Sequence, residues 1–254
     1  MQPIIDAHIH FDQYTLKEQQ GIMKEMEHYQ IHSLISVSTN LSSAVENLAL
    51  YQKDERIKLA FGYHPEQPLP TDEELADLIQ FMDKNHQAMV AIGEVGLPYY
   101  TNVKSLEGYL ALLEEFFKLA VKWNKPVALH AIYEDAPIVI NLLEKYSIQK
   151  AHFHWFKGDT KTIQQMVENS YFISFTPDLA YEHEIQKIAA TYPLSLTMVE
   201  TDGPWPFEGP FQGQKTHPKM IHETIRYLAK IKSTHVDEVY RQLYNNTILF
   251  YSIF

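Results

Sequence analysis

Short apolar runs alternate with longer amphipathic segments along almost all of this chain, and this alternation limits the fold more than any other feature. Apolar and β-branched residues in runs of strand length, bounded by polar residues, predict buried strands. The predicted strands cover residues 5–10, 33–38, 57–61, 88–92, 126–130, 150–154, 171–175 and 194–200. Apolar residues at helical spacing predict helices over residues 15–29, 72–84, 105–123, 135–146, 160–168 and 182–191, and over a segment that Asn40 or Ser42 caps and that runs to Tyr51.

Strands that alternate with helices through short connections favour a parallel sheet covered by helices. A polar and aromatic loop at 202–217 follows the last strand, and two more helices are predicted over residues 218–231 and 236–250. No linker interrupts the pattern, and 254 residues with 45% hydrophobic content can bury a large core. We therefore predict an α/β fold with a single domain over residues 1–254, a closed (β/α)8 TIM barrel, the alternative being an open doubly wound sheet.

The composition excludes several classes of protein. The chain has no cysteine, which rules out disulfides, thiolate metal sites and cysteine nucleophiles. Its formal net charge of −11 argues against a broad basic surface for duplex DNA, although a small molecule or a strand end can still reach a site whose charge comes from a bound cation. We find neither a signal-peptide pattern nor an apolar run of transmembrane length, so we expect a cytoplasmic protein without membrane contact. The sequence leaves the oligomeric state open.

Residues that can bind metal ions collect where the predicted strands end. His8 and His10 lie two residues apart, and alternate residues of a strand point to the same face, so both imidazoles can reach one ion. Such a pair alone is often coincidental. The carboxyl ends of all strands of a (β/α)8 barrel meet at one mouth, and the other candidates at these ends are His64, Glu94, His130, His152, His154 and Asp202. Imidazole and carboxylate ligands suit zinc, manganese or a similar divalent ion, and their number favours two ions bridged by a carboxylate.

Six segments of the chain together resemble the TatD family of metal-dependent hydrolases, and the resemblance extends over essentially the whole chain. The segments are 5–10 (IDAHIH), 62–65 (GYHP), 91–97 (AIGEVGL), 125–130 (KPVALH), 154–158 (HWFKG) and 200–204 (ETDGP). The resemblance implies an amidohydrolase-type barrel that binds one or two divalent ions, which can be Zn, Mn, Mg, Ni or Fe. The implied ligands are His8, His10, Glu94, His130, His154 and Asp202.

The resemblance also implies a mechanism. A metal-activated water would attack the substrate, because a divalent ion lowers the pKa of water towards neutrality. Glu94 and Asp202 would be the catalytic carboxylates, Glu94 as the bridge between ions and Asp202 as the group that accepts the proton of the water or holds it in line. His154 aligns with the ligand of the family, so we predict that His152 lies one layer deeper. His64 matches a family position that is not a ligand, and we expect there either a turn residue or a residue that contacts a metal ligand or the substrate.

The chain departs from the family at two positions that bear on the substrate. Relatives usually carry an aspartate at the position of Pro98 and an arginine at that of Ile132. Because arginine binds phosphate through two parallel hydrogen bonds that isoleucine cannot make, the loss weakens the case for a nuclease or phosphoesterase. Lys157, Lys215 or Lys219 can supply a cation instead. Trp155, Trp205, Phe207 and Phe211 can stack on a base, although exposed lysines and loop aromatics more often have no such role.

Three functions are consistent with these residues. The leading hypothesis is a divalent-metal-dependent hydrolase of the TatD type that cleaves phosphodiester bonds, as a deoxyribonuclease or exonuclease acting on DNA ends. The alternative enzyme is an amidohydrolase that acts on a small lactone, amide or phosphoester, which the substitutions at Pro98 and Ile132 and the acidic charge favour. The third hypothesis is a barrel that binds metal without turnover.

Overall fold

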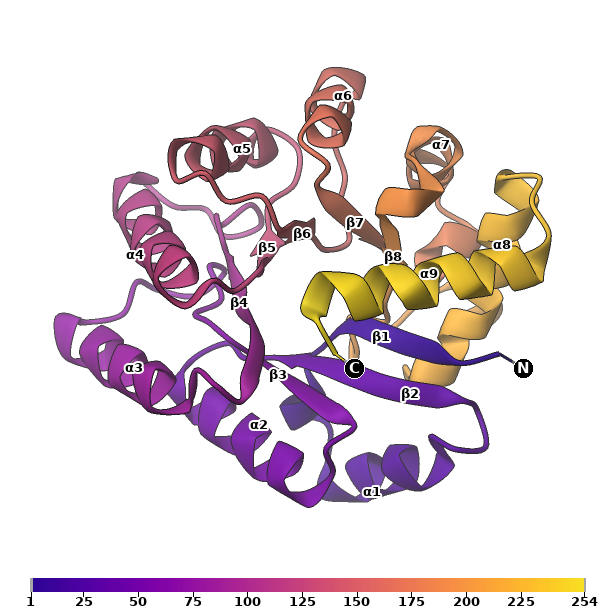
Figure 1. Cartoon of the computed structure of the whole chain (residues 1–254), viewed down its shortest axis with the longest axis horizontal. Coiled ribbons are helices and arrows are strands. Elements are labelled where there is room, and N and C mark those ends of the chain that lie inside the picture. The colour runs from indigo at the N-terminus through magenta and orange to yellow at the C-terminus, as the bar shows by residue number, and fades with distance from the viewer. Residues whose placement is uncertain (1, 254) are drawn as a thin grey trace.

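The computed structural model describes residues 2–253 and has the barrel architecture predicted from the sequence. The strands run in sequence order around one parallel sheet of eight (Figure 1). They are β1 (Ile4–Ile9), β2 (Ile31–Val37), β3 (Ile57–Phe61), β4 (Met89–Gly96), β5 (Val127–His130), β6 (Ala151–Phe153), β7 (Phe172–Phe175) and β8 (Thr197–Val199). Just beyond β8, the Asp202 N–H donates to the His8 carbonyl at 3.0 Å and the His10 N–H to the Gly203 carbonyl at 2.8 Å. These bonds join the last strand to the first and close the barrel.

Helices surround the barrel in the order that the sequence pattern predicts (Figure 1). They are α1 (Leu16–Glu25), α2 (Leu41–Lys53), α3 (Asp72–Asn85), α4 (Glu107–Trp123), α5 (Asp135–Lys145), α6 (Thr160–Glu168), α7 (His183–Thr191), α8 (Ile221–Ile231) and α9 (Val236–Tyr251). Several begin at side chains that satisfy the free N–H groups of the first turn. Thr15 and Thr71 form capping boxes with Glu18 and Glu74, and Asn40, one of the two predicted caps, accepts from the Ser43 N–H.

The last helix seals the end of the barrel opposite the predicted active site. Phe250 and Tyr251, at the end of α9, form an apolar cluster with strand residues such as Ile5, Ile35 and Met198. The Tyr251 hydroxyl lies 2.7 Å from Nδ1 of the fully buried His152. The predicted terminal helix therefore completes the core of the barrel.

Several predicted boundaries were wrong. Strand β4 continues to Gly96, so Glu94 lies inside a strand and does not follow one. Helix α1 stops at Glu25, and a turn with Gln30 in the left-handed region (φ 52°) leads into β2. Residues Leu194–Leu196, predicted as strand, form a 3-10 helix, because Pro193 precedes them and the paired strand begins only at Thr197. The loop after β8 also contains 3-10 turns, at Gly209–Phe211 and Pro218–Met220.

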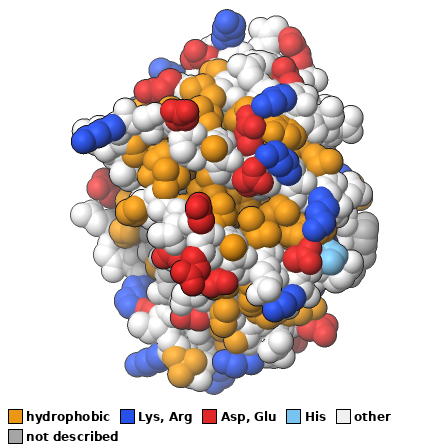
Figure 2. Space-filling model, turned by 90° about the vertical axis from the view of Figure 1, so that its left-hand side faces the viewer, with side chains coloured by type: hydrophobic (Ala, Val, Ile, Leu, Met, Phe, Trp, Pro, Cys, Tyr) orange, Lys and Arg blue, Asp and Glu red, His pale blue; other side chains and the backbone are white. Residues whose placement is uncertain are grey.

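The surface that is visible in Figure 2 carries both acidic and basic side chains. This face corresponds to the left-hand side of Figure 1, where α3 and α4 lie, and its basic and acidic side chains are interspersed among apolar ones. Among the described residues seen there, the basic side chains form no continuous patch. Within residues 2–253, none of the helices combines the length and the apolar character that crossing a membrane requires.

Candidate metal centre

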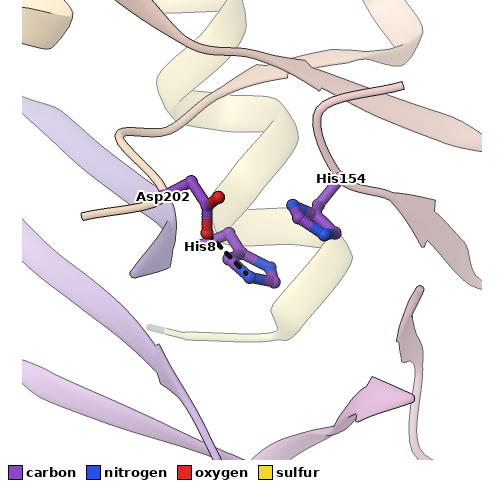
Figure 3. A group of neighbouring side chains, drawn as sticks. All are labelled: His8, His154 and Asp202. Atoms are coloured by element: carbon purple, nitrogen blue, oxygen red, sulfur yellow. Dashed lines mark ion pairs between the residues drawn. The ribbon is translucent and has the colours of Figure 1, made fainter. Parts of the chain in front are cut away.

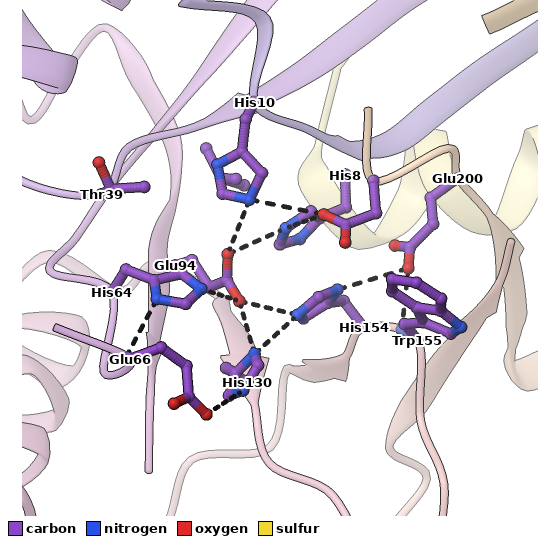
Figure 4. A network of polar contacts seen from close by, with 12 residues as sticks. His8, His10, Thr39, His64, Glu66, Glu94, His130, His154, Trp155 and Glu200 are labelled. Carbon is purple, nitrogen blue, oxygen red and sulfur yellow. Dashed lines mark hydrogen bonds and ion pairs between the residues drawn. The ribbon is translucent and has the colours of Figure 1, made fainter. Parts of the chain in front are cut away.

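Five histidines and two carboxylates from separate strand ends converge at the mouth of the barrel, and Glu94 lies at their centre (Figure 4). Its Oε2 atom lies 3.1 Å from His8 Nε2 and 3.3 Å from His10 Nε2. Both histidines come from β1 and the residue that follows it, so the predicted alternation of side chains does place the two imidazoles together.

The second oxygen of Glu94 faces a separate group of imidazoles. Glu94 Oε1 lies 2.7 Å from His154 Nε2, 3.0 Å from His130 Nδ1 and 3.3 Å from His64 Nε2. The Glu94 side chain is completely buried. One carboxylate therefore stands between two groups of nitrogen donors, each of which meets a different oxygen.

Asp202 completes the group that contains His8. It follows β8 and adopts a left-handed backbone conformation (φ 47°), which aspartate tolerates better than most residues. Its Oδ1 atom lies 3.5 Å from Nε2 of both His8 and His10. His8, His154 and Asp202 together offer three potential ligand atoms (Figure 3).

Two glycines allow the strands to bring these side chains close together. A Cβ atom on Gly62, which follows β3, would lie 2.6 Å from the Glu94 carbonyl oxygen. A Cβ atom on Gly96 would lie 1.9 Å from the His130 carbonyl oxygen. Any side chain at either position would push apart the backbones that carry Glu94 and His130.

Buried carboxylates outside the centre support its histidines. Glu200 accepts hydrogen bonds from the Trp155 N–H at 2.8 Å and the Ser174 hydroxyl at 2.5 Å, and its Oε1 atom lies 3.5 Å from His154 Nδ1. Asp6 accepts from the Thr201 N–H at 2.9 Å and the Thr201 hydroxyl at 2.5 Å. Burial raises the pKa of Asp6 to about 8. These bonds fix β6 and β8 beside β1 at the depth of the metal centre.

The pKa values of the groups in the centre are strongly shifted. Burial alone would raise the pKa of Glu94, but the charges of His64, His154 and His8 hold it well below its usual range. Burial opposes a charge on His10 as well, yet the carboxylates of Asp202 and Glu94 beside its ring raise the pKa of His10 to about 10. For His8, burial and the neighbouring His154 lower the pKa. Carboxylates held ionised among imidazoles give a set of ligands for a cation.

The donors fit a divalent metal ion. Asp202 Oδ1 and the Nδ1 atoms of His8, His10 and His154 are buried without a hydrogen-bond partner among the described residues. A buried polar atom without a partner is costly, and a bound ion removes this cost for a carboxylate oxygen. Imidazole nitrogen and carboxylate oxygen are the ligands that zinc, manganese and iron prefer.

His64 and His152 differ from the other histidines in how their ring nitrogens are used. His64 Nδ1 accepts a hydrogen bond from the Glu66 N–H at 3.1 Å, so its ring proton sits on Nε2 and points at Glu94. With this tautomer His64 is a donor at the mouth, and it also belongs to a group with Glu94 and His130 whose atoms lie close enough together to hold an ion. Both nitrogens of His152 are occupied, by the Tyr251 and Ser174 hydroxyls at 2.7 Å each. His154 thus faces the centre, and His152 lies below it.

The predicted substrate residues lie at varying positions around the centre. Trp205 has 57% of its surface exposed and packs edge-on against Trp155, at 5.9 Å between ring centroids. Lys157 places its ammonium 5.2 Å from the Trp155 ring. Lys215, by contrast, is exposed and pairs with Glu18 at the start of α1. Ile132, at the position where relatives usually carry arginine, is 4% exposed.

Sequence analysis missed three carboxylates that contact the predicted site. Asp6 and Glu200 each lie two residues before a predicted ligand, within the segments 5–10 and 200–204, and this spacing was a usable signal. Glu66 carried no signal, because its partners at residues 99–101 and 130 are distant in the sequence.

Comparison with known proteins identifies the family. The profile described as TatD related DNase matches residues 5–252. The chain belongs to the TatD family. A metal-dependent hydrolase of Haemophilus influenzae is 38% identical over 255 residues, which cover 98% of this chain and 100% of that protein. The human deoxyribonuclease TATDN3 is 26% identical, over 93% of this chain and 91% of its own length.

Solved structures give the same result. The crystal structure of YjjV, a TatD homologue from Escherichia coli, superposes with a TM-score of 0.89 at 25% identity, and the match covers 98% of each chain. The predicted TatD resemblance, the barrel and a metal-dependent hydrolase of this family are confirmed. The roles of individual residues remain predictions.

Proposed function

We propose that this protein is a divalent-metal-dependent phosphodiesterase that cleaves DNA, at or near strand ends. The observation that carries the proposal is the position of Glu94, whose two oxygens face His8 and His10 on one side and His130 and His154 on the other. A carboxylate in this position suits a bridge between two ions, which is a common arrangement in enzymes that hydrolyse phosphate esters. The family and the human deoxyribonuclease TATDN3 support the substrate class.

The ligands proposed are His8, His10, Glu94 and Asp202 on one side of the centre, and Glu94, His130 and His154 on the other. Divalent ions bound there would supply Lewis acidity at the phosphate and would lower the pKa of a water molecule. Asp202 accepts the proton of the attacking water or holds that water in line, because its Oδ1 atom is buried and free of other partners. His64 donates from Nε2 to an oxygen of the substrate.

The residues around the metal centre suit the end of single-stranded DNA better than a duplex. Trp155 and Trp205 offer aromatic faces beside Asp202, and stacking on such faces binds unpaired bases without regard to sequence. Lys157 adds one positive charge next to these rings. We propose Trp205 and Lys157 as substrate contacts. Lys215 is a weaker candidate, because Glu18 already neutralises it.

A second candidate function follows from Ile132. This buried apolar side chain leaves the wall of the mouth without the two parallel hydrogen bonds that an arginine would make with phosphate. A small lactone, amide or phosphoester needs no such contact, so hydrolysis of such a compound is the alternative.

DNA cleavage tests the first proposal directly. Purified protein is loaded with Mn²⁺, Mg²⁺ or Zn²⁺ and incubated with end-labelled single- and double-stranded oligonucleotides. Asp202→Asn removes the proposed proton acceptor and a ligand, so we expect cleavage to fall on the order of 100-fold or more. Asp237→Asn, on the exposed first turn of α9, is the matched control and should cleave like the natural protein.

The outcomes separate the three hypotheses. Wild-type cleavage that does not exceed the Asp202→Asn background would remove the nuclease assignment, and turnover of a lactone, amide or small phosphoester panel would then support the alternative. Binding of a divalent ion, seen as a rise in melting temperature, without turnover of either substrate set would support a non-catalytic barrel. The cytoplasmic location and the single domain over residues 1–254 remain predictions, which cell fractionation and limited proteolysis test.

A further inference from the structure

Glu66, in the segment between β3 and α3, makes an unusually large number of contacts beside the metal centre (Figure 4). Its Oε1 atom accepts hydrogen bonds from the N–H groups of Tyr99 at 2.6 Å and Tyr100 at 2.8 Å, and its Oε2 atom accepts from the Thr101 N–H at 2.6 Å. Oε1 also lies 3.2 Å from His130 Nε2.

His130 is oriented differently from the other proposed ligands. It directs Nδ1 at Glu94, at 3.0 Å, whereas His8, His10 and His154 direct Nε2 at the same carboxylate. A neutral imidazole carries one proton, and with a cation on the Nδ1 side that proton would lie on Nε2, where the Glu66 carboxylate accepts it. The lone pair of Nδ1 then faces the centre. The geometry of His130 therefore depends on what lies behind its ring.

The Glu66 carboxylate also connects His130 to the loop at residues 99–101. The three N–H groups that it accepts belong to consecutive residues after Pro98, in the loop that joins β4 to α4. Tyr99 and Tyr100 are 36% and 66% exposed, and the Tyr100 ring lies 6.1 Å from the ring of His130. Any shift of this loop is transmitted through the Glu66 carboxylate to a proposed ligand.

We propose that Glu66 is a positioning residue of the metal centre, whose carboxylate fixes the tautomer and orientation of His130 and ties the loop at residues 99–101 to it. The inference rests on the proposed function in one respect, because it takes His130 to be a metal ligand. Partners that hold the outer nitrogen of a ligating histidine typically change metal affinity by 10- to 100-fold when they are replaced.

Titration of the metal-free protein with Co²⁺ tests the role without any turnover. Glu66→Gln keeps the length of the side chain, but its NH₂ group must face either a backbone N–H or the His130 N–H. We expect Co²⁺ to bind about 10- to 100-fold more weakly than to the natural protein, with a changed visible absorption spectrum. Glu115→Gln removes an exposed carboxylate on α4 that pairs with Lys118, and should leave both the Co²⁺ affinity and the spectrum unchanged.

Natural Co²⁺ affinity and an unaltered spectrum in Glu66→Gln would overturn the proposal. If that variant does not fold, as judged by circular dichroism, Glu66→Asp takes its place. Its shorter side chain cannot span His130 and residues 99–101 together, so undiminished Co²⁺ affinity there overturns the proposal equally. The assays also separate this inference from the proposed function: a natural protein that binds Co²⁺ but cleaves no DNA refutes the nuclease and leaves the role of Glu66 in place.

Discussion

Replacing Gly62 by alanine should damage the metal centre although it leaves the side chain of every proposed ligand in the sequence. The added Cβ atom would lie 2.6 Å from the Glu94 carbonyl oxygen, 2.7 Å from the Gly93 carbonyl carbon and 2.9 Å from the Glu94 nitrogen. Ordinary contact begins at 3.4 Å, so β3 and β4 must separate by about 0.8 Å. All three atoms belong to the backbone, and no side-chain rotation can relieve the contact.

The expected magnitude follows from this displacement. Forcing one additional carbon into a packed core costs about 1–3 kcal/mol of stability. Because Glu94 contacts the four proposed histidine ligands, a shift approaching 1 Å should also lower catalytic activity on the order of 10- to 100-fold. Urea unfolding measures the free energy of unfolding, titration with Mn²⁺ measures metal affinity, and cleavage of labelled DNA measures activity.

Gly21→Ala is the matched control. Gly21 lies in α1, and a Cβ atom there would meet nothing within 4 Å. Alanine should stabilise this helix by about 0.5–1 kcal/mol and leave Mn²⁺ binding unchanged. If Gly62→Ala bound Mn²⁺ as tightly as the natural protein does, the argument that close approach of β3 and β4 positions Glu94 would be refuted.

Three further predictions concern residues around the centre. Glu200→Gln should weaken Mn²⁺ binding about 10- to 100-fold in calorimetric titration, because Glu200 lies behind His154, and natural affinity would contradict that role. Trp205→Ala should raise KM for a single-stranded oligonucleotide about 5- to 100-fold at unchanged Mn²⁺ affinity, and an unchanged KM would exclude stacking on this residue. Burial and the nearby Lys219 lower the pKa of His217 to about 4 in the folded protein. As the pH decreases from about 6.5 to 4, His217 is therefore protonated in the unfolded chain but not in the folded one, and the free energy of unfolding should fall. In His217→Asn the side chain can still accept a hydrogen bond from the Lys219 N–H. Urea unfolding at pH 7 and at pH 4.5 should show that this variant loses up to about 3 kcal/mol less stability between the two pH values than the natural protein does. The same loss in both proteins would show that His217 does not titrate in this way.

The order and type of the helices and strands were predictable, because hydrophobic periodicity is a local property of the sequence. Predictions failed where pairing with a neighbouring strand decided the outcome. Strand β4 extends through Gly93, Glu94 and Gly96 because β5 pairs with it as far as His130. Residues Leu194–Leu196 have apolar side chains typical of a strand, but the bonds of a 3-10 turn hold them outside the sheet.

The candidate ligands were found because they were predicted to lie at strand ends, which a barrel gathers at one mouth, and the TatD resemblance selected six of them. The period-two spacing of His8 and His10 was informative only together with the candidates at the other strand ends. The partners that orient those ligands were less visible. Glu66 reaches His130 across 64 residues of sequence, and no local pattern indicates such a contact.

The sequence by itself therefore determined the strand and helix order, the closed barrel and the chemical identity of the groups at its mouth, since these follow from periodicity and from residue type. Only the tertiary structure decided which oxygen of Glu94 faces which histidine, that His64 donates from Nε2, and that His130 presents Nδ1. Distances and tautomers depend on how separate strands pack against each other. The sequence pattern indicates which residues come together, and the packing of the barrel determines which of their atoms are in contact.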